Sequence, residues 1–326
     1  MNESVKDMPP IQRLNLVTTK YCNLNCRMCD WKKSFPLFMP EPSFSQWKSV
    51  IQEFAMLGGK ELEISGGEPM MRKDIYQIIS HAQSCGLTVL MVSNGVLIGP
   101  VEVENLLAAG LGAISISLEG PEELNDKLRG PGNFQKALNT IRNFLSHQAG
   151  YPDLRVYVGI TLSKYNYAEI LSFSKYLLEE IGVHSIAINP FTIGMLRGRN
   201  RRTRPVEFDI PPELIPDLTL ELERLIEYAQ SVPGKLPSPN FLNQIPNYFR
   251  GKRFIPPGGC HIPETFGGIH PTGFFFSCWR YPPIGNVFKM SLTEILSSRK
   301  YQEFRKRALA GKCDGCVTSC YTEIYS

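Results

Sequence analysis

Short apolar segments alternate with longer amphipathic segments from residue 13 to residue 190. The apolar segments have the length of strands, and the segments between them carry apolar residues at helical spacing. Six strands are predicted in this way, at residues 13–18, 61–64, 88–92, 113–118, 155–162 and 185–189. Alternating strands and helices predict a parallel sheet covered by helices, with functional residues after the carboxyl ends of the strands. We therefore expect an α/β fold with six β/α units.

The chain after residue 200 has a different composition. Prolines are frequent from residue 205 to residue 257, and one amphipathic helix is predicted near residues 213–230. We expect residues 1–200 to hold the six β/α units, residues 201–254 to be a connector with one helix, and residues 255–326 to be a small C-terminal domain.

Composition and charge limit the class of protein. The chain has 326 residues, 43% of them hydrophobic and 20% charged, which is an ordinary globular composition. The apolar runs are far shorter than the roughly 20 residues of a membrane helix, and residues 1–10 lack the apolar core of a secretion signal. The net charge of +4 is too small for a general nucleic-acid-binding surface. We expect a cytoplasmic protein without a membrane span, and nucleic acid is not an expected partner.

Three cysteines, Cys22, Cys26 and Cys29, follow the first predicted strand, with three and then two residues between them. Clustered cysteines in a chain without an export signal indicate metal ligands rather than disulfides. Thiolates bind zinc, copper(I) or iron–sulfur clusters. Structural zinc prefers four ligands, and no fourth Cys or His lies nearby in the sequence. A [4Fe–4S] cluster with one open iron therefore fits better than a zinc loop, which remains the alternative.

The cysteine motif and two later turns together resemble the radical S-adenosylmethionine (SAM) superfamily. Residues 65–69 read Ser-Gly-Gly-Glu-Pro after the second strand, and residues 93–95 read Ser-Asn-Gly after the third. The resemblance implies a partial (β/α)6 TIM-type barrel whose cluster binds SAM and cleaves it to a 5′-deoxyadenosyl radical. It also implies that Gly66, Gly67, Glu68, Ser93 and Asn94 contribute to the SAM site.

The segment after the fourth strand resembles peptide- and sulfatase-modifying radical SAM enzymes. Residues 116–120, 124–130 and 133–138 carry this likeness, with Glu119 in place of the commoner Asp and Asn125 in place of the commoner His. The resemblance implies that Ser117 and Arg129 bind the SAM carboxylate, for which an arginine fork is suited. An exposed arginine after a turn is the alternative for Arg129. Asn166, after the fifth strand, corresponds in position to the segment that surrounds the adenine.

A second group of cysteines lies in the C-terminal part of the chain and comprises Cys260, Cys278, Cys313, Cys316 and Cys320. Residues 270–278 are predicted to form a β-hairpin, and residues 292–309 carry a helical pattern. The arrangement resembles the shortened SPASM-type domain called Twitch, which holds one auxiliary [4Fe–4S] cluster. Five cysteines exceed the four that one cluster needs, so Cys320 either is a ligand or is free near the substrate. A zinc ribbon is the alternative for this domain.

An arginine-rich segment follows the sixth predicted strand, near the expected active-site mouth. An anionic substrate, an acidic flavodoxin- or ferredoxin-like electron donor, or plain solvation each explains this charge. The arginines are Arg197, Arg199, Arg201, Arg202 and Arg204.

Taken together, these patterns predict a radical SAM oxidoreductase or epimerase with two [4Fe–4S] clusters. Oxidation requires an electron acceptor, whereas epimerisation requires a hydrogen donor, and Cys320 is the candidate catalytic donor. Only 12 residues precede the first predicted strand, so we expect no N-terminal peptide-recognition domain and favour a small substrate, such as a sugar or aminocyclitol. Modification of a ribosomal peptide is the alternative, and a non-catalytic, metal-bound RNA-associated protein is the alternative of another class.

Overall fold

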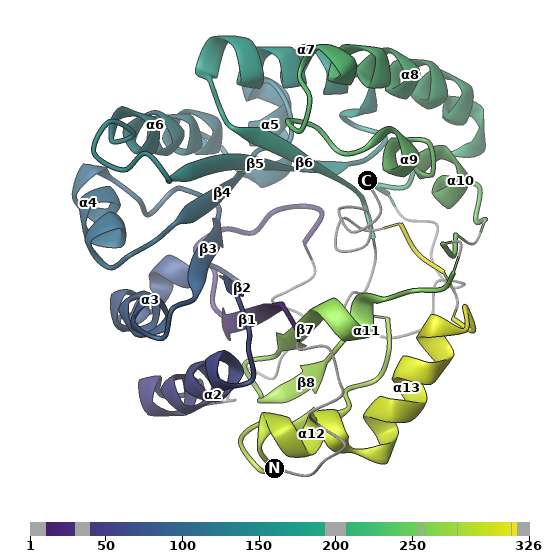
Figure 1. Cartoon of the computed structure of the whole chain (residues 1–326). Coiled ribbons are helices and arrows are strands. Elements are labelled where there is room, and N and C mark those ends of the chain that lie inside the picture. The colour runs from purple at the N-terminus through teal and green to yellow at the C-terminus, as the bar shows by residue number, and fades with distance from the viewer. Residues whose placement is uncertain are drawn as a thin grey trace.

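The computed structural model describes residues 11–29, 40–192, 207–252, 254–256, 258–278, 280–313 and 315–317. A curved parallel sheet with helices on its outer side forms most of this part of the chain (Figure 1). Six parallel strands follow one another in chain order, as predicted. They are β1 (Arg13–Thr19), β2 (Glu61–Gly66), β3 (Thr88–Ser93), β4 (Ala113–Ser117), β5 (Arg155–Leu162) and β6 (Ser185–Pro190).

The sheet does not end at β1 but continues into the C-terminal part of the chain. β7 (Phe266–Ile269) pairs in parallel with β1, and β8 (Phe274–Phe276) and β9 (Gly285–Asn286) follow in antiparallel pairing. The strand order is β6-β5-β4-β3-β2-β1-β7-β8-β9, so the barrel is partial and open. A C-terminal hairpin is present, but it is formed by β7 and β8, so its first strand precedes the predicted range of residues 270–278. It extends the same sheet.

The helices of the barrel cover one face of the sheet. They are α2 (Phe44–Met56), α3 (Ile75–Ser84), α4 (Pro100–Ala108), α5 (Glu122–Arg129), α6 (Asn133–Ser146) and α7 (Ile170–Lys175), which continues into a π-helical segment, η4 (Tyr176–Ile181). A short 3-10 turn, η2 (Pro69–Met71), follows β2, and another, η3 (Tyr167–Glu169), precedes α7. α2 begins with a capping box, in which the Ser43 hydroxyl accepts from the Gln46 N–H and the Gln46 side chain accepts from the Ser43 N–H.

The opposite face of the sheet carries polar side chains where β1 and β2 meet. In β2, Leu62 and Ile64 are buried in the hydrophobic core, so the side chains between them point to the inner face of the barrel. On that face the Ser65 hydroxyl donates to the Asn15 side chain at 3.0 Å, and the Asn15 amide donates to Glu63 at 2.5 Å. The barrel interior therefore offers hydrogen-bonding groups to a bound molecule.

The stretch predicted as a connector is packed into the core. It contains η6 (Pro212–Leu214), α8 (Ile215–Ser231), α9 (Pro239–Leu242) and α10 (Ile245–Phe249), so the expectation of a single helix was wrong. Its apolar side chains, including Leu218, Leu225 and Phe241, are buried in the same core as the barrel strands. Proline was a misleading signal here, because Pro212, Pro239 and Pro246 lie in the first turns of helices, where proline is tolerated.

The C-terminal part adds α11 (Ile262–Thr265), α12 (Leu292–Ser297) and α13 (Arg299–Leu309). It contacts the barrel through α2, because both carboxylate oxygens of Glu53 accept backbone N–H groups at the start of α12, from Leu292 at 2.8 Å and Thr293 at 2.9 Å. Trp47 of α2 also packs edge-on against Phe288, with ring centroids 5.7 Å apart. Among the described residues, no helix is both long and apolar enough to cross a membrane.

The contact between Glu53 and α12 leads to a stability prediction. Replacing Glu53 by Ala leaves two N–H groups of α12 without their acceptor, so we expect the free energy of unfolding to fall by about 1–2 kcal/mol. Chemical denaturation measures this change. Gln52→Ala, at the exposed neighbouring position on α2, is the control and should change stability by less than about 0.5 kcal/mol. Equal stability of the two variants would contradict the docking role of Glu53.

Candidate active site

The three N-terminal cysteines lie in a loop that leaves the carboxyl end of β1, and we call residues 20–29 the cysteine loop. Figure 1 shows this loop extending across the inside of the curved sheet. Its far end contacts the end of α5, where the Arg27 N–H donates to the Leu128 carbonyl at 2.9 Å. The Cys26 thiol lies 3.9 Å from the carbonyl oxygen of Arg129. The loop therefore joins the first and fourth β/α units over the mouth of the barrel.

The three thiols are close enough to influence one another. Burial raises the pKa of the Cys26 thiol, and the neighbouring Cys29 and Cys22 thiols act in the same direction. The Arg129 guanidinium acts in the opposite direction and favours the thiolate. The backbone N–H of Leu24 also points at the Cys22 sulfur, 3.4 Å away. Thiolates with nearby N–H donors and a cation are suited to an iron–sulfur cluster, so the residues present fit that group.

The turn after β2 lies against the base of the cysteine loop. The N–H groups of Gly67 and Glu68 donate to the carbonyls of Thr19 and Tyr21, at 2.9 and 2.8 Å. A Cβ on Gly67 would overlap the Tyr21 carbonyl oxygen, so only glycine permits this approach. Gly67 therefore allows the turn after β2 to contact the cysteine loop itself, in addition to any role toward SAM.

Glu68 links the ends of β2 and β3. Its carboxylate is completely buried and accepts from the Ser93 hydroxyl at 2.8 Å, the Asn94 N–H at 2.8 Å and the Met70 N–H at 3.1 Å. Burial raises the pKa of Glu68, and these three donors oppose that shift. The Asn94 side-chain amide in turn donates to Asn23 of the cysteine loop at 2.8 Å.

Arg129 is buried and paired, so its alternative as an exposed turn residue was wrong. Its side chain is 12% exposed, and its Nε donates to the fully buried Glu119 carboxylate at 2.9 Å. The second carboxylate oxygen of Glu119 accepts from the Thr161 N–H at 2.7 Å. Burial raises the pKa of Glu119, while Arg129 lowers it. In the sequence, Glu119 stands out only as a departure from the commoner Asp, and the arginine ten residues later is the signal for this pair.

Asn166 and Ser117 occupy neighbouring strand ends. The Asn166 amide donates to the carbonyls of Glu119 and Thr161, and its oxygen accepts from the Ser163 N–H at 2.8 Å. Asn166 thus connects the ends of β4 and β5. Ser117 ends β4, is half-buried and pairs with Gly159. Whether either contacts SAM stays a prediction.

The structure gathers four of the C-terminal cysteines. Burial raises the pKa of Cys260 to about 12, and Cys316, Cys278 and Cys313 add to that shift. The pKa of Cys278 is raised to about 11, again by burial first and then by Cys316 and Cys313. The Cys278 sulfur also accepts from the Arg280 N–H at 3.4 Å. Four thiols within electrostatic range fit the ligand set of one cluster.

Within the described ranges, no three His, Cys, Asp or Glu side chains are close enough together to hold one metal ion. Two predicted features lie outside the described residues: the thiol of Cys320, and the arginine-rich segment of residues 197–204.

Comparison with known protein families agrees with this geometry. The Radical SAM superfamily matches residues 16–177, and the SPASM iron-sulfur cluster-binding domain matches residues 260–317. The AdoMet-dependent heme synthase of Methanosarcina barkeri is 35% identical over 322 residues, which cover 91% of this chain and 86% of that protein. The chain belongs to the radical SAM superfamily. Its two matched domains indicate two iron–sulfur clusters and SAM as cofactors.

Other relatives share only part of their length with this chain. The PqqA peptide cyclase of Xanthomonas euvesicatoria is 30% identical over 42% of this chain and 36% of that protein. The sporulation killing factor maturation protein SkfB of Bacillus subtilis is 32% identical over 48% of this chain and 37% of that protein. The chain therefore spans less than half the length of these two relatives.

Solved structures share the fold at low identity. Streptococcus suis SuiB has a TM-score of 0.71 at 16% identity and covers 96% of this chain and 74% of that chain. The enzyme anSMEcpe with bound AdoMet has a TM-score of 0.69 at 16% identity and covers 92% of this chain and 84% of that chain. These likenesses confirm the predicted fold class, a partial barrel with a C-terminal iron–sulfur domain.

The contact between Gly67 and the cysteine loop gives a second prediction. Gly67→Ala forces the loop away from β2, because the added methyl group meets a backbone oxygen that has no freedom to rotate. We expect a loss of stability of at least about 1–3 kcal/mol, together with a lower iron content after anaerobic reconstitution. Gly150→Ala is the control, because a Cβ there meets only ordinary van der Waals contact. A Gly67→Ala protein with the stability and iron content of the control would disprove the close approach.

Proposed function

We propose that this chain is a radical SAM enzyme that removes a hydrogen atom from an unactivated C–H bond of its substrate. In this proposal Cys22, Cys26 and Cys29 hold a [4Fe–4S] cluster, which supplies the electron that cleaves SAM. The observation that carries the proposal is the convergence of these thiols, the Arg129 cation and a polar barrel interior at one end of the parallel sheet.

The residues around the cysteine loop have two kinds of proposed role. Gly66, Gly67, Ser93, Asn94 and Ser117 supply backbone and side-chain groups to SAM. Arg129 binds the SAM carboxylate, and its pairing with Glu119 holds the guanidinium plane in place.

Two buried side chains are proposed to shape the SAM site rather than to contact SAM. Glu68 and Asn166 connect the carboxyl ends of neighbouring strands, and their polar atoms already have partners within the protein. Both residues therefore fix the relative positions of the loops from which the SAM-binding groups project.

The second cluster is proposed to bind to Cys260, Cys278, Cys313 and Cys316. These four thiols lie within electrostatic range of one another, which supports a ligand set that does not need Cys320. This arrangement favours an oxidation in which the auxiliary cluster accepts the electron of the substrate radical. The alternative, an epimerisation with Cys320 as hydrogen donor, stays a prediction, and so does the pairing of the arginine-rich segment with an anionic substrate or an acidic electron donor.

The comparisons change the proposed substrate class. The main prediction was a sugar or aminocyclitol, but the relatives include a peptide cyclase and a peptide maturation protein, and SuiB was crystallised with its precursor peptide SuiA. These similarities support the peptide alternative over the sugar. We therefore propose a ribosomally made peptide as the first candidate substrate. We also propose a cytoplasmic location, because clustered cysteines that serve as metal ligands need a reducing compartment.

A second candidate substrate rests on a different observation. The heme synthase of Methanosarcina barkeri aligns with nearly the whole chain, including the C-terminal domain, whereas the peptide enzymes align over less than half of it. An iron porphyrin with carboxylate side chains is therefore the second candidate. Both candidates agree with an oxidation that passes one electron to the auxiliary cluster.

The cluster assignment is tested by replacing Cys22, Cys26 and Cys29 together by Ala. We expect this variant to retain only the auxiliary cluster, about four irons per chain instead of about eight, and to lose dithionite-driven formation of 5′-deoxyadenosine. Iron analysis and chromatography of the nucleoside measure both effects. Cys85→Ala is the control, since Cys85 is half-buried against the hydrophobic core. Continued formation of 5′-deoxyadenosine by the triple variant would overturn the assignment.

The substrate class is tested by adding candidate molecules to the reconstituted enzyme with SAM and dithionite. The candidates are Fe-coproporphyrin III and synthetic copies of short peptides encoded beside the gene, and an aminocyclitol is added for comparison. A substrate should raise the rate of 5′-deoxyadenosine formation above the substrate-free rate and should itself change in mass. Loss of a hydrogen pair from a peptide supports the first candidate, and loss of carboxyl groups from the porphyrin supports the second. Conversion of an aminocyclitol alone would refute both.

A further inference from the structure

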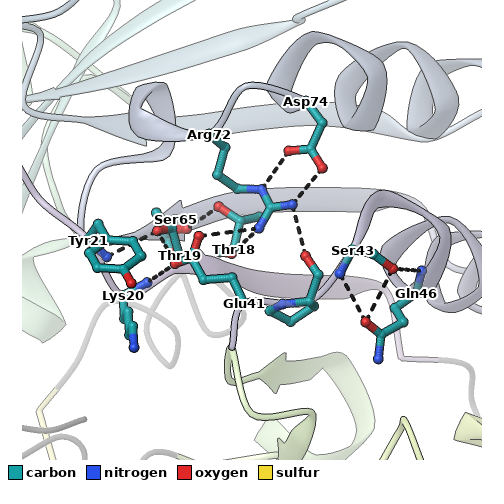
Figure 2. Close-up of polar contacts among 11 residues, drawn as sticks. Thr18, Thr19, Lys20, Tyr21, Glu41, Ser43, Gln46, Ser65, Arg72 and Asp74 are labelled. Carbon is teal, nitrogen blue, oxygen red and sulfur yellow. Dashed lines mark hydrogen bonds and ion pairs between the residues drawn. The ribbon is translucent and has the colours of Figure 1, made fainter. Parts of the chain in front are cut away.

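The buried guanidinium of Arg72 contacts both ends of the segment that connects β1 with α2. Nη1 of Arg72 donates to the Thr18 carbonyl at 3.0 Å, and Nη2 donates to the Pro42 carbonyl at 3.0 Å (Figure 2). Thr18 lies in β1 just before the cysteine loop, and Pro42 lies just before α2. One side chain therefore holds together the two ends of the chain segment that carries Cys22, Cys26 and Cys29.

A carboxylate from the far end of the same segment orders the backbone just before the first cysteine. Glu41 accepts from the Thr19 hydroxyl and from the Lys20 N–H, the latter at 2.9 Å. The Thr19 hydroxyl oxygen also accepts from the Tyr21 N–H at 3.1 Å. Figure 2 shows Glu41 lying between this backbone and Arg72, whose Nη1 is 3.8 Å from its carboxylate. Residues 19–21 are thus held in one conformation directly before Cys22.

Asp74 fixes the plane of the Arg72 guanidinium. It accepts from Nε at 2.8 Å and from Nη2 at 2.6 Å, which is the bidentate geometry that an arginine fork favours. The Arg72 side chain is only 6% exposed, so its charge is compensated inside the protein by Asp74 and Glu41. A lysine could not make these contacts, because its single ammonium lacks the planar fork that reaches two carbonyls and a carboxylate together.

We infer that Arg72 and Glu41 are positioning residues that set the conformation of the cysteine loop before a cluster binds. Flexible loops lose conformational entropy when their ligands converge on one site, and holding the loop ends beforehand lowers that cost. The inference rests on the proposed function, because the loop is taken to hold the SAM-binding cluster. A purely structural ion pair would stabilise the fold without affecting loop order or cluster retention, and this difference can be measured.

The first test uses the chain without clusters, so its result does not depend on the proposed function. Hydrogen exchange of the backbone amides of Lys20 and Tyr21 is measured in the native protein and in Arg72→Lys, which retains the charge but not the fork. We expect these amides to lose roughly tenfold or more of their protection in the variant, because the contacts that oppose local opening are lost. Arg13→Lys is the matched control. Arg13 pairs with Glu61 at the amino ends of β1 and β2, whereas the cysteine loop leaves the carboxyl end of β1. Unchanged protection in Arg72→Lys would overturn the inference.

The second test measures how long the reconstituted enzyme keeps its SAM-binding cluster. An iron chelator removes the cluster, and the loss is monitored through the electron paramagnetic resonance signal that shifts when SAM is added. The other cluster is the internal control. We expect Arg72→Lys to lose the SAM-responsive cluster roughly tenfold faster, with the auxiliary cluster and Arg13→Lys unchanged.

A variant with milder effects on folding keeps the inference falsifiable if Arg72→Lys does not fold. Glu41→Ala removes the acceptor of the Lys20 N–H and should reproduce both effects in part, while Glu41→Gln retains an acceptor oxygen and should lie closer to the native protein. Equal loss of both clusters, or native behaviour of Glu41→Ala, would refute the positioning role. A different outcome would contradict the proposed function instead. In that outcome the variant loses amide protection, but the native enzyme has no cluster that responds to SAM.

Discussion

The position of β1 in the middle of the sheet is the constraint on which the rest of the structure depends. β1 pairs in parallel with β2 on one side and with β7 on the other, and both faces of it are buried. The cysteine loop leaves its carboxyl end, and the described C-terminal cysteines belong to the domain that contains its neighbour β7. Both groups of thiols are therefore placed relative to one buried strand, which gives the two proposed clusters a defined separation without a flexible linker.

Burial of ionisable groups is the main electrostatic cost of the site. The thiols of Cys26, Cys260 and Cys278 all have pKa values raised by burial, so the protein without clusters holds them protonated at neutral pH. Binding of the proposed clusters to these thiols would release those protons. Arg129 lowers this cost at Cys26, and Glu119 compensates the charge of Arg129. The same two residues therefore connect the cysteine loop with the strand ends at which SAM is proposed to bind.

The polar inner face of the barrel and the proposed chemistry agree with one another. A radical that removes hydrogen from carbon needs a substrate held in a fixed pose, and the half-buried Glu63 and Ser65, both held by the buried Asn15, carry hydrogen-bonding groups on that face. Peptides and carboxylated porphyrins both carry groups that pair with such side chains. The two candidates differ in size and shape. The loops around the mouth, rather than the strands, therefore decide which of them the barrel admits.

The sequence by itself determined the barrel strands and the kind of chemistry. Local hydrophobic periodicity identified all six barrel strands. The motif of Cys22, Cys26 and Cys29, together with the turns at residues 65–69 and 93–95, carried the resemblance that implies the class of cofactor, because each of these signals lies within a few neighbouring residues. Only the tertiary structure showed that residues 215–249 pack into the core, that Glu119 pairs with Arg129, and that Arg72 joins the two ends of the cysteine segment. These contacts join residues that are 10 to 54 positions apart or lie on different elements. No local pattern encodes such contacts, because burial and a shared strand edge bring the partners together only when the whole sheet has formed.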